Sequence, residues 1–220
     1  MSELMDLLKL TGICPILVDS EPDSTIPAAE ALIQGGVPVM EILMRNEASK
    51  ANLKKIAREL PGLLVGAGTV LGVEQAREVI DLGAKFIVMP GFQREVVELC
   101  VNRQIPVLPG CVTPTEIMMA LDYGINVVKF FPVYQMGGLD TLAQLNGGPF
   151  PNVQFVVTGG LNATNFLPLM AHKNVLAAGG DWMFADYHAL TARNFKQITS
   201  NIRKSLNEVM DIRAGSSSGK

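Results

Sequence analysis

Histidine, cysteine and tryptophan are scarce in this sequence of 220 residues. It has two histidines (His172 and His188), three cysteines (Cys14, Cys100 and Cys111) and one tryptophan. Three scattered cysteines are too few for a disulfide framework or a zinc site, and we expect them to be buried as small apolar side chains. The two histidines lie in polar stretches and are expected at the surface, so no metal centre and no cofactor are predicted. Any chemistry must therefore rest on lysine, glutamate, arginine and backbone groups.

A strong charge of one sign and long apolar runs are also lacking. The formal net charge of −3 offers no basic surface for nucleic acid or for an anionic membrane. No apolar run approaches the roughly 20 residues that a transmembrane helix needs. The first residues, MSELMDLLKLTG, carry acidic side chains where an export signal would carry basic ones. We therefore expect a cytoplasmic protein that binds neither nucleic acid nor membranes.

The sequence does contain an eightfold alternation of short apolar runs with amphipathic segments. The apolar runs start 20 to 27 residues apart, the length of one strand–helix unit, and they end in Gly, Pro or Thr. They are ICPILV (13–18), VPVMEIL (37–43), LLVGAG (63–68), KFIVMP (85–90), IPVLPG (105–110), NVVKFF (126–131), VQFVVTGG (153–160) and VLAAGG (175–180). Helices are predicted over residues 2–10, 49–60, 95–103, 115–124 and roughly 189–212.

This alternation predicts an α/β fold with a parallel, buried sheet, because the strands are apolar on both faces. Eight such units favour a single (β/α)8 TIM barrel over residues 1–213, with a capping helix at its N-terminus. The low-complexity tail 214–220 is expected to be disordered. An open, doubly wound sheet is the alternative. However, Asp19-Ser20-Glu21-Pro22 stands after the first run, where that fold usually has a glycine-rich nucleotide loop.

Lys129 is an unusual residue for its position, near the end of the sixth apolar run. Lysine is among the residues least often buried. Burial disfavours the charged ammonium, which makes the neutral amine available as a nucleophile. The alternative is a lysine that reaches solvent at a strand end. Lys85 starts the fourth run, at the opposite end of the barrel, and we expect it to be an ordinary exposed lysine.

Glu41 is a second polar residue inside an apolar run. Strand alternation places it on the same side as Val39 and Leu43, inside the barrel or at its mouth. A buried carboxylate there suits a general acid/base. It is alternatively a structural ion pair with Arg45. A lysine and a glutamate that converge at one barrel mouth together provide an amine nucleophile and a proton shuttle.

The ends of other runs supply groups that bind anions. Arg45 follows the second run, where its guanidinium can hold a carboxylate with two hydrogen bonds. The pairs Gly159-Gly160 and Gly179-Gly180 follow runs seven and eight, at the usual phosphate-binding loops of such barrels. A glycine pair is by itself often only a tight turn, so the prediction of a phosphate site rests on the presence of two pairs after adjacent runs.

The order of motifs resembles the family of 2-keto-3-deoxy-6-phosphogluconate (KDPG) and 4-hydroxy-2-oxoglutarate (KHG) aldolases. The resemblance extends from about residue 4 to 208. It is carried by GGVPVMEILMRN (35–46), VGAGTVL (65–71), FIVMPGF (86–92), PVLPGCVTPTE (106–116), VVKFFPV (127–133), GPFPNVQFVVTGG (148–160) and VLAAGGDWM (175–183). The resemblance implies a class I lyase of carbohydrate metabolism, of the Entner–Doudoroff type. It also implies assembly as a homotrimer without a metal.

The resemblance assigns a role to each matching residue. Lys129 matches the Schiff-base lysine, Glu41 the acid/base glutamate, and Arg45 the arginine that holds the pyruvoyl carboxylate. The remaining matches are expected to line the substrate pocket: Thr69 at the pyruvoyl end, Pro90 and Phe131 around the imine, Thr158 beside the substrate hydroxyls, and Gly159, Gly160 and Gly180 in the phosphate loops.

Two positions depart from the family pattern. Asp181 stands where KDPG-cleaving members usually have a serine that contacts the substrate phosphate. Two unit charges about 4–5 Å apart, with an effective dielectric near 20, repel by roughly 3–4 kcal/mol. The alternative is that Asp181 turns outward and caps the next short helix. Val133-Tyr134-Gln135-Met136 also replaces the common Ala-Glu, so both departures concern the aldehyde half of the substrate.

We therefore predict reversible cleavage of a 4-hydroxy-2-oxo acid to pyruvate and an aldehyde. KDPG, which yields glyceraldehyde 3-phosphate, is the first candidate. KHG, which yields glyoxylate, and other unphosphorylated or epimeric sugar acids are the alternatives. A sugar-phosphate isomerase or epimerase on the same barrel would not need a buried lysine. A non-catalytic barrel would not retain both Lys129 and Glu41 in apolar surroundings.

Overall fold

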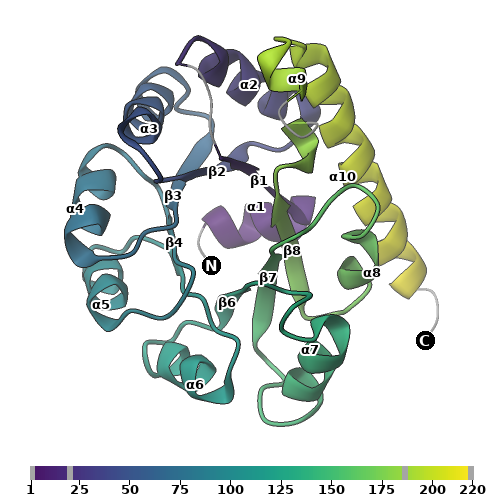
Figure 1. The fold of residues 1–220 in the computed structure, drawn as a ribbon. Helices are drawn as coiled ribbons and strands as arrows, with labels where there is room; N and C mark the ends of the chain where they lie inside the picture. Colours follow the sequence, from purple (N-terminus) through teal and green to yellow (C-terminus); the bar gives the residue numbers. More distant parts are fainter. Residues whose placement is uncertain (1–2, 19–21, 185–187, 218–220) are drawn as a thin grey trace.

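The computed structural model describes residues 3–18, 22–184 and 188–217. Its centre is a barrel of eight parallel strands, which Figure 1 draws as arrows and labels where there is room. The strands are β1 (Ile13–Leu17), β2 (Val39–Leu43), β3 (Leu64–Gly68), β4 (Ile87–Val88), β5 (Val107–Leu108), β6 (Val127–Phe130), β7 (Gln154–Thr158) and β8 (Val175–Gly180). The predicted (β/α)8 barrel is confirmed.

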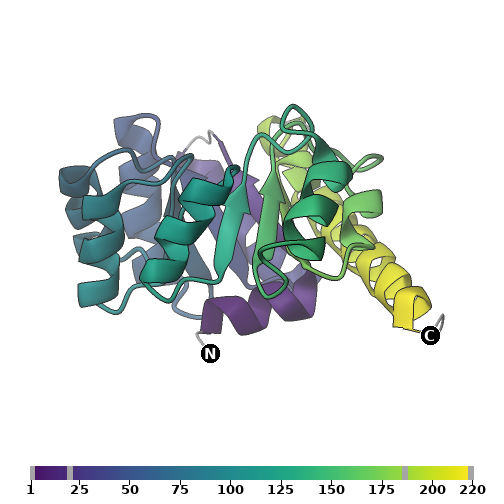
Figure 2. The same cartoon turned by 90° about the horizontal axis from the view of Figure 1, so that it is seen from below.

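Helices surround the strands and cover the outer face of the barrel (Figure 1). They are α1 (Glu3–Thr11), α2 (Pro22–Gly35), α3 (Glu47–Glu59), α4 (Val73–Asp81), α5 (Arg94–Asn102), α6 (Pro114–Asp122), α7 (Gly138–Gly147), α8 (Leu167–Met170), the 3₁₀ helix η1 (Trp182–Phe184), α9 (His188–Thr191) and α10 (Phe195–Ser217). Figure 2 shows α1 beneath the barrel, where it contacts β1, β2 and β8. Helix α1 thus closes the end of the barrel at which the strands begin.

Neighbouring strands pair in the order β5-β4-β3-β2-β1-β8-β7-β6. The remaining gap, between β6 and β5, is closed by a bridge between Lys129 and Gly110. The Lys129 amide donates to the Pro109 carbonyl, and the Cys111 amide donates to the Lys129 carbonyl, both at 2.9 Å. The backbone of one residue therefore completes the barrel.

The strands are mostly apolar because the barrel interior covers one face and the helices cover the other. Met40 and Ile42 of β2 are at most 2% exposed, and Phe86, next to β4, is fully buried. Loops follow each strand at the opposite end from α1. The residues that come directly after the strands therefore gather at one mouth, where functional side chains of such barrels lie.

Several boundaries differ from those expected from the sequence. Strands β4 and β5 keep only two paired residues each. The helix expected over 189–212 consists of α9 and α10 with a break between them, and α10 continues to Ser217. The tail expected from residue 214 therefore overlaps the end of α10, and its disorder stays a prediction. The segment Asp19-Ser20-Glu21 lies outside the described residues.

Gly110 offers a test of the barrel closure. A Cβ atom at Gly110 would collide with the backbone of Pro90 and Gly91, which follow β4. Because a backbone neighbour has little freedom to move, we expect Gly110→Ala to lower the free energy of unfolding by about 1–3 kcal/mol. Urea denaturation followed by circular dichroism measures this change.

Gly62→Ala is the matched control, because a Cβ at Gly62 meets no atom within 4 Å. We expect this variant to unfold within about 0.5 kcal/mol of the parent protein. Equal midpoints for Gly110→Ala and Gly62→Ala would show that the closure tolerates a side chain and would refute the close-approach argument.

Candidate functional site

Lys129 lies in the interior of the barrel. Lys129 is 6% exposed and lies in β6 between the fully buried Val128 and Phe130. Its Nζ lies 5.4 Å from the centroid of the Phe131 ring, a distance typical of a cation–π contact. The alternative of a lysine that reaches bulk solvent is wrong. Lys85, by contrast, is exposed, as expected.

Glu41 faces Lys129 across the barrel. It is 2% exposed, and its Oε1 lies 3.6 Å from Lys129 Nζ. Strands β2 and β6 are four steps apart in the strand order, and therefore on opposite sides of the barrel. Glu41 Oε1 forms no hydrogen bond with the described residues. The carboxylate is thus paired by charge, and this oxygen remains available to a reacting group.

Glu41 does not form the structural ion pair with Arg45 that the sequence left as an alternative. The ion pair of Glu41 is with Lys129, and Arg45 is exposed after the end of β2. A Cβ at Gly68 would occupy the position of the Glu41 carboxyl group. The absence of a side chain at Gly68 therefore leaves the space in which the Glu41 carboxylate lies.

Cys14 of β1 shares this buried environment. Burial, and then the negative charge of Glu41, raise the pKa of its thiol, while the charge of Lys129 acts in the opposite direction. Cys100 and Cys111 are also buried, so all three thiols are in the state expected from the sequence. A protonated, enclosed thiol is a poor nucleophile, which leaves Lys129 as the nucleophile at this site.

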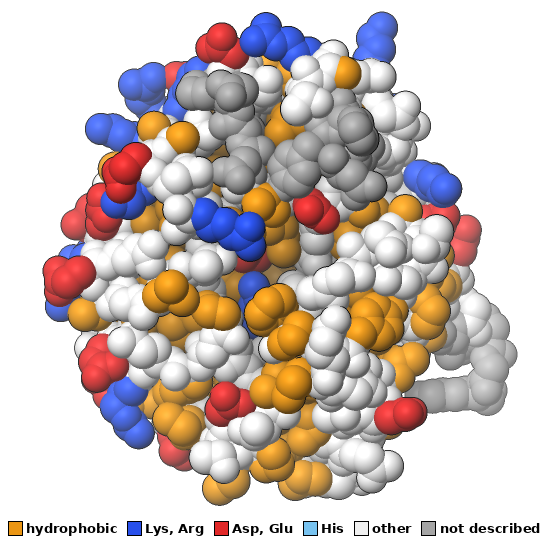
Figure 3. Space-filling view, in the orientation of Figure 1, with side chains coloured by type: hydrophobic (Ala, Val, Ile, Leu, Met, Phe, Trp, Pro, Cys, Tyr) orange, Lys and Arg blue, Asp and Glu red, His pale blue; other side chains and the backbone are white. Residues whose placement is uncertain are grey.

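A cavity of about 250 Å³ opens above the Lys129–Glu41 pair at the mouth of the barrel. Figure 3 shows this face with basic side chains (blue) near its centre and hydrophobic side chains (orange) beside them. Every candidate from the sequence except Glu41 lines the cavity. These residues are Arg45, Thr69, Pro90, Lys129, Phe131, Thr158, Gly159, Gly160, Gly180 and Asp181. Glu41 lies buried beside Lys129.

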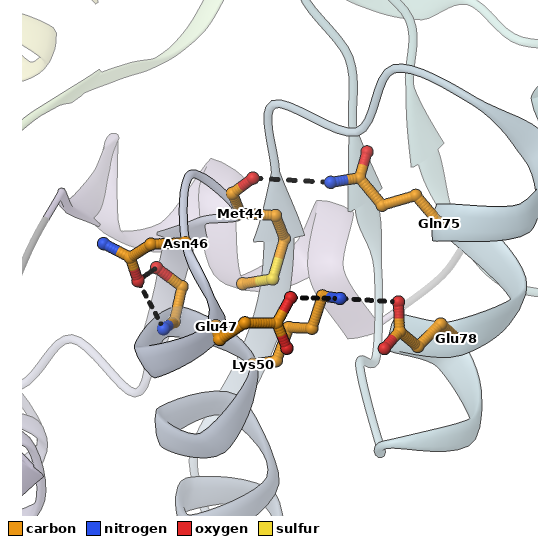
Figure 4. Close-up of polar contacts among 7 residues, drawn as sticks. Met44, Asn46, Glu47, Lys50, Gln75 and Glu78 are labelled. Atoms are coloured by element: carbon orange, nitrogen blue, oxygen red, sulfur yellow. Dashed lines mark hydrogen bonds and ion pairs between the residues drawn. The ribbon is translucent and has the colours of Figure 1, made fainter.

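Arg45 is carried by a loop whose flanking residues are held in place. The Met44 carbonyl accepts a hydrogen bond from Gln75 Nε2 at 3.3 Å, and Asn46 Oδ1 caps α3 by accepting from the Ser49 amide at 2.9 Å. Figure 4 shows these contacts. It also shows Lys50, which joins Glu47 to Glu78 of α4 through contacts of 2.8 and 2.9 Å.

Gln75 connects the loop of Arg45 to the loop of Thr69. Its Oε1 accepts from the Leu71 amide at 2.9 Å, while its Nε2 binds the Met44 carbonyl. Thr69 has a φ of 57°, a left-handed conformation that is unusual for a β-branched residue. Such backbone strain costs about 1–3 kcal/mol and is concentrated at functional sites. The Gln75 bonds help to hold both loops in place.

The opposite wall of the cavity comes from the ends of β7 and β8. Thr158 is 3% exposed, and its Oγ1 has no hydrogen-bond partner among the described residues. Gly159 and Gly160 both have positive φ values, of 101° and 68°. Asp181 directly follows β8 and is half-buried.

The described residues contain no cluster of three or more His, Cys, Asp or Glu side chains placed to hold a metal ion. His172 is half-buried rather than fully at the surface, and burial, then the charge of Lys173, lower its pKa. The side chain of His188 lies outside the described part of the chain. Across the same described residues, no helix is long and apolar enough to cross a membrane.

Sequence reasoning missed four apolar residues of the cavity and did not choose Gly179 as a site residue. The four are Ile16, Val18, Leu43 and Leu161. Ile16 and Val18 end the first apolar run at alternate positions, so strand alternation contained a signal for them. Leu161 follows Gly160 in a loop and had no such signal.

The chain as a whole is similar to proteins of known name. Residues 4–201 match the sequence model of the family described as KDPG and KHG aldolase. The KHG/KDPG aldolase of Escherichia coli (strain K12) is 38% identical over 201 residues, which cover 91% of this chain and 93% of that protein. The 2-dehydro-3-deoxy-phosphogluconate aldolase of Treponema pallidum (strain Nichols) is 37% identical over 206 residues, 94% of this chain and 97% of that protein.

A solved structure is similar in fold as well as in sequence. The KDPG aldolase from Legionella pneumophila, crystallised with pyruvate captured at low pH as a covalent carbinolamine intermediate, superposes with a TM-score of 0.87. It is 32% identical, and the match covers 93% of this chain and 98% of that one.

Proposed function

We infer that this chain, which belongs to the KDPG and KHG aldolase family, is a class I aldolase that reversibly cleaves a 4-hydroxy-2-oxo acid to pyruvate and an aldehyde. The observation that carries this proposal is the buried contact of 3.6 Å between Lys129 and Glu41 at the floor of the cavity. An amine and a carboxylate held together in a nearly dry site are the two groups that imine chemistry needs.

The first half of the proposed reaction forms the imine. Lys129 Nζ attacks C2 of the substrate and gives a carbinolamine, whose hydroxyl leaves as water. Before the attack, Glu41 takes a proton from the Lys129 ammonium and so makes Nζ nucleophilic. It then passes a proton from the attacking nitrogen to the carbonyl oxygen and gives its own proton to the leaving hydroxyl. Its free Oε1 and its distance from Nζ support this shuttle. The result is a protonated imine at Lys129.

The second half breaks the C3–C4 bond. The C4 hydroxyl loses its proton, the aldehyde departs, and the bonding electrons pass into the protonated imine to give an enamine. Protonation of C3 and hydrolysis of the imine then release pyruvate and restore Lys129. We propose that Glu41 accepts the proton of the C4 hydroxyl and returns it to C3 of the enamine, so that one carboxylate serves the proton transfers at C2, C3 and the C4 hydroxyl.

The remaining residues of the cavity are proposed to position the substrate. Arg45, on its fixed loop, binds the 2-oxo acid carboxylate, and Thr69 lines that end of the cavity. Pro90 and Phe131 pack around the imine. Thr158 offers its unpartnered hydroxyl to a substrate hydroxyl. Gly159, Gly160, Gly180 and Asp181 line the wall that receives the aldehyde half, for which KDPG and KHG are the substrates suggested by the names of relatives.

We also propose that the protein is a cytoplasmic homotrimer. The resemblance to the family supports this assembly. Size-exclusion chromatography with light scattering tests this proposal, with an expected mass three times that of one chain. The mass of a monomer or a dimer would exclude the trimer without affecting the aldolase proposal.

Trapping with pyruvate tests the role of Lys129. Incubation with pyruvate and borohydride should attach one reduced pyruvyl group to Lys129 and inactivate the enzyme, which peptide mass spectrometry and an activity assay measure. Lys129→Arg should show no adduct and at least a 10³-fold lower kcat, because it keeps the charge beside Glu41 but has no nucleophilic amine.

Lys85→Arg is the matched control, since Lys85 also lies next to an apolar strand but is exposed at the other end of the barrel. It should react and turn over like the parent protein. An adduct on any lysine other than Lys129, or no adduct, would contradict the assignment. An isomerase or epimerase would likewise give no adduct.

Proton exchange tests the role of Glu41. In deuterated water, Glu41→Gln should exchange the methyl protons of pyruvate about 10²-fold more slowly than the parent protein, because the general acid/base is lost. Nuclear magnetic resonance follows the exchange. Glu74→Gln, an exposed glutamate of α4, is the control and should exchange at the parent rate. Unchanged exchange in Glu41→Gln would make Glu41 a structural residue only.

A further inference from the structure

Asp181 places a carboxylate on the wall of the cavity that receives the aldehyde half of the substrate. It directly follows Gly180, the last residue of β8, and it lines the same cavity as Lys129 and Arg45. The side chain is half-buried, so its charge is only partly screened by solvent.

The Asp181 carboxylate has no partner among the described residues. The ion pairs that the structure contains do not involve it, and it forms no side-chain hydrogen bond there. The Phe184 amide donates to the backbone carbonyl of Asp181, at 2.8 Å, and not to its carboxylate. The alternative that Asp181 caps the following helix therefore lacks the bond that defines a cap.

Positive charge in the cavity is confined to its other side. Among the described lining residues the only cations are Arg45, after β2, and Lys129, of β6. The proposed mechanism uses Arg45 for the 2-oxo acid carboxylate and Lys129 for the imine. No lysine or arginine among the lining residues comes from the β7 or β8 end, so a phosphate there would face Asp181 without a counter-charge.

Helix termini do not replace the missing cation. The helix after β8 is η1, a 3₁₀ helix of three residues, and the helix after β7 is α8, of four residues. Aligned peptide dipoles sum along a helix, so helices this short present little positive charge at their N-termini. The wall offers glycine backbone but no strong attraction for a dianion.

Hydroxyl groups, in contrast, suit this wall. Thr158 Oγ1 is buried without a partner, and the Asp181 carboxylate accepts hydrogen bonds only. A hydrogen bond from a neutral hydroxyl to a carboxylate is stronger than one between two neutral groups. A substrate chain that carries free hydroxyl groups would satisfy both side chains.

The height of Asp181 in the barrel indicates which carbons it meets. Lys129 is level with Val156 of β7, which pairs with Ala177 of β8. Asp181 lies four residues beyond Ala177, or roughly 13 Å further toward the open mouth at about 3.3 Å per residue. The extended Lys129 side chain covers part of this rise, so Asp181 faces the far end of a six-carbon chain and not its reacting centre.

We propose that Asp181 determines the substrate class of this enzyme. The preferred substrates are six-carbon 4-hydroxy-2-oxo acids that carry several hydroxyl groups and end in a free hydroxyl, rather than the terminal phosphate esters of these acids. The terminal hydroxyl donates a hydrogen bond to the Asp181 carboxylate, whereas a terminal phosphate is repelled by it. This inference rests on the proposed aldolase function and narrows its substrate.

The test compares 2-keto-3-deoxygluconate with its 6-phosphate as substrates of the full-length chain. The parent protein should have at least a tenfold higher kcat/KM on the unphosphorylated acid. Asp181→Asn keeps the shape of the side chain and removes the charge. It should raise kcat/KM on the phosphate ester at least tenfold, equivalent to about 1.4 kcal/mol, and lower it about threefold on the unphosphorylated acid.

Asp140→Asn is the matched control, because it removes the same charge from the exposed start of α7, outside the cavity. Its substrate preference should equal that of the parent protein. Inorganic phosphate gives a second readout: it should inhibit Asp181→Asn competitively at concentrations that leave the parent protein unaffected.

A parent protein that prefers the phosphate ester, or an Asp181→Asn variant whose preference is unchanged, would overturn the proposal. Pyruvate trapping on Lys129 of the parent protein reports the aldolase function separately, because pyruvate lacks the carbons that approach Asp181. If pyruvate is trapped on Lys129 but neither six-carbon acid is cleaved, only the proposed substrate class is rejected. If pyruvate is not trapped, the underlying aldolase function is rejected.

Discussion

The contact between Lys129 and Glu41 depends on closure of the barrel and determines what the site can do. The two side chains come from β6 and β2, opposite strands of the ring, and their charged ends meet 3.6 Å apart in the interior. Burial of either charge alone would be strongly unfavourable, so each stabilises the other in a place with little access to water. An open sheet would keep these strands far apart. Closure of the barrel is therefore a requirement of the chemistry as well as of the fold.

The same lysine contributes to closure through its backbone. Its amide and carbonyl bond to Pro109 and Cys111 across the gap between β6 and β5. The position of the amine is thus tied to the hydrogen bonds that complete the ring, and not to a flexible loop. Sites built on strands are held more precisely than sites built on loops. The loops supply the groups around this fixed centre. Gln75 links the loop that carries Arg45 to the loop that carries Thr69.

Charge divides the cavity into two halves with different roles. Arg45 and Lys129 make one half attractive to the carboxylate of a 2-oxo acid, and relatives named for two different substrates, KDPG and KHG, share this fold and family. Asp181 and Thr158 give the other half acceptor groups without a nearby cation. We propose that the first half fixes the reaction, while the second half selects the aldehyde. Substrate class can then change through one residue after β8 without any change at Lys129 or Glu41.

The sequence alone predicted the fold, because apolar runs that recur every 20 to 27 residues permit few structures other than a barrel. Lys129 and Glu41 were identifiable because charged residues inside apolar strands are rare. The sequence did not determine that Glu41 pairs with Lys129 rather than with the nearby Arg45, nor that Leu161 lines the cavity. Only the tertiary structure decided these points. Side-chain alternation specifies which face of a strand a residue occupies, whereas the ring specifies which strands lie opposite one another, and that depends on contacts between residues distant in the chain.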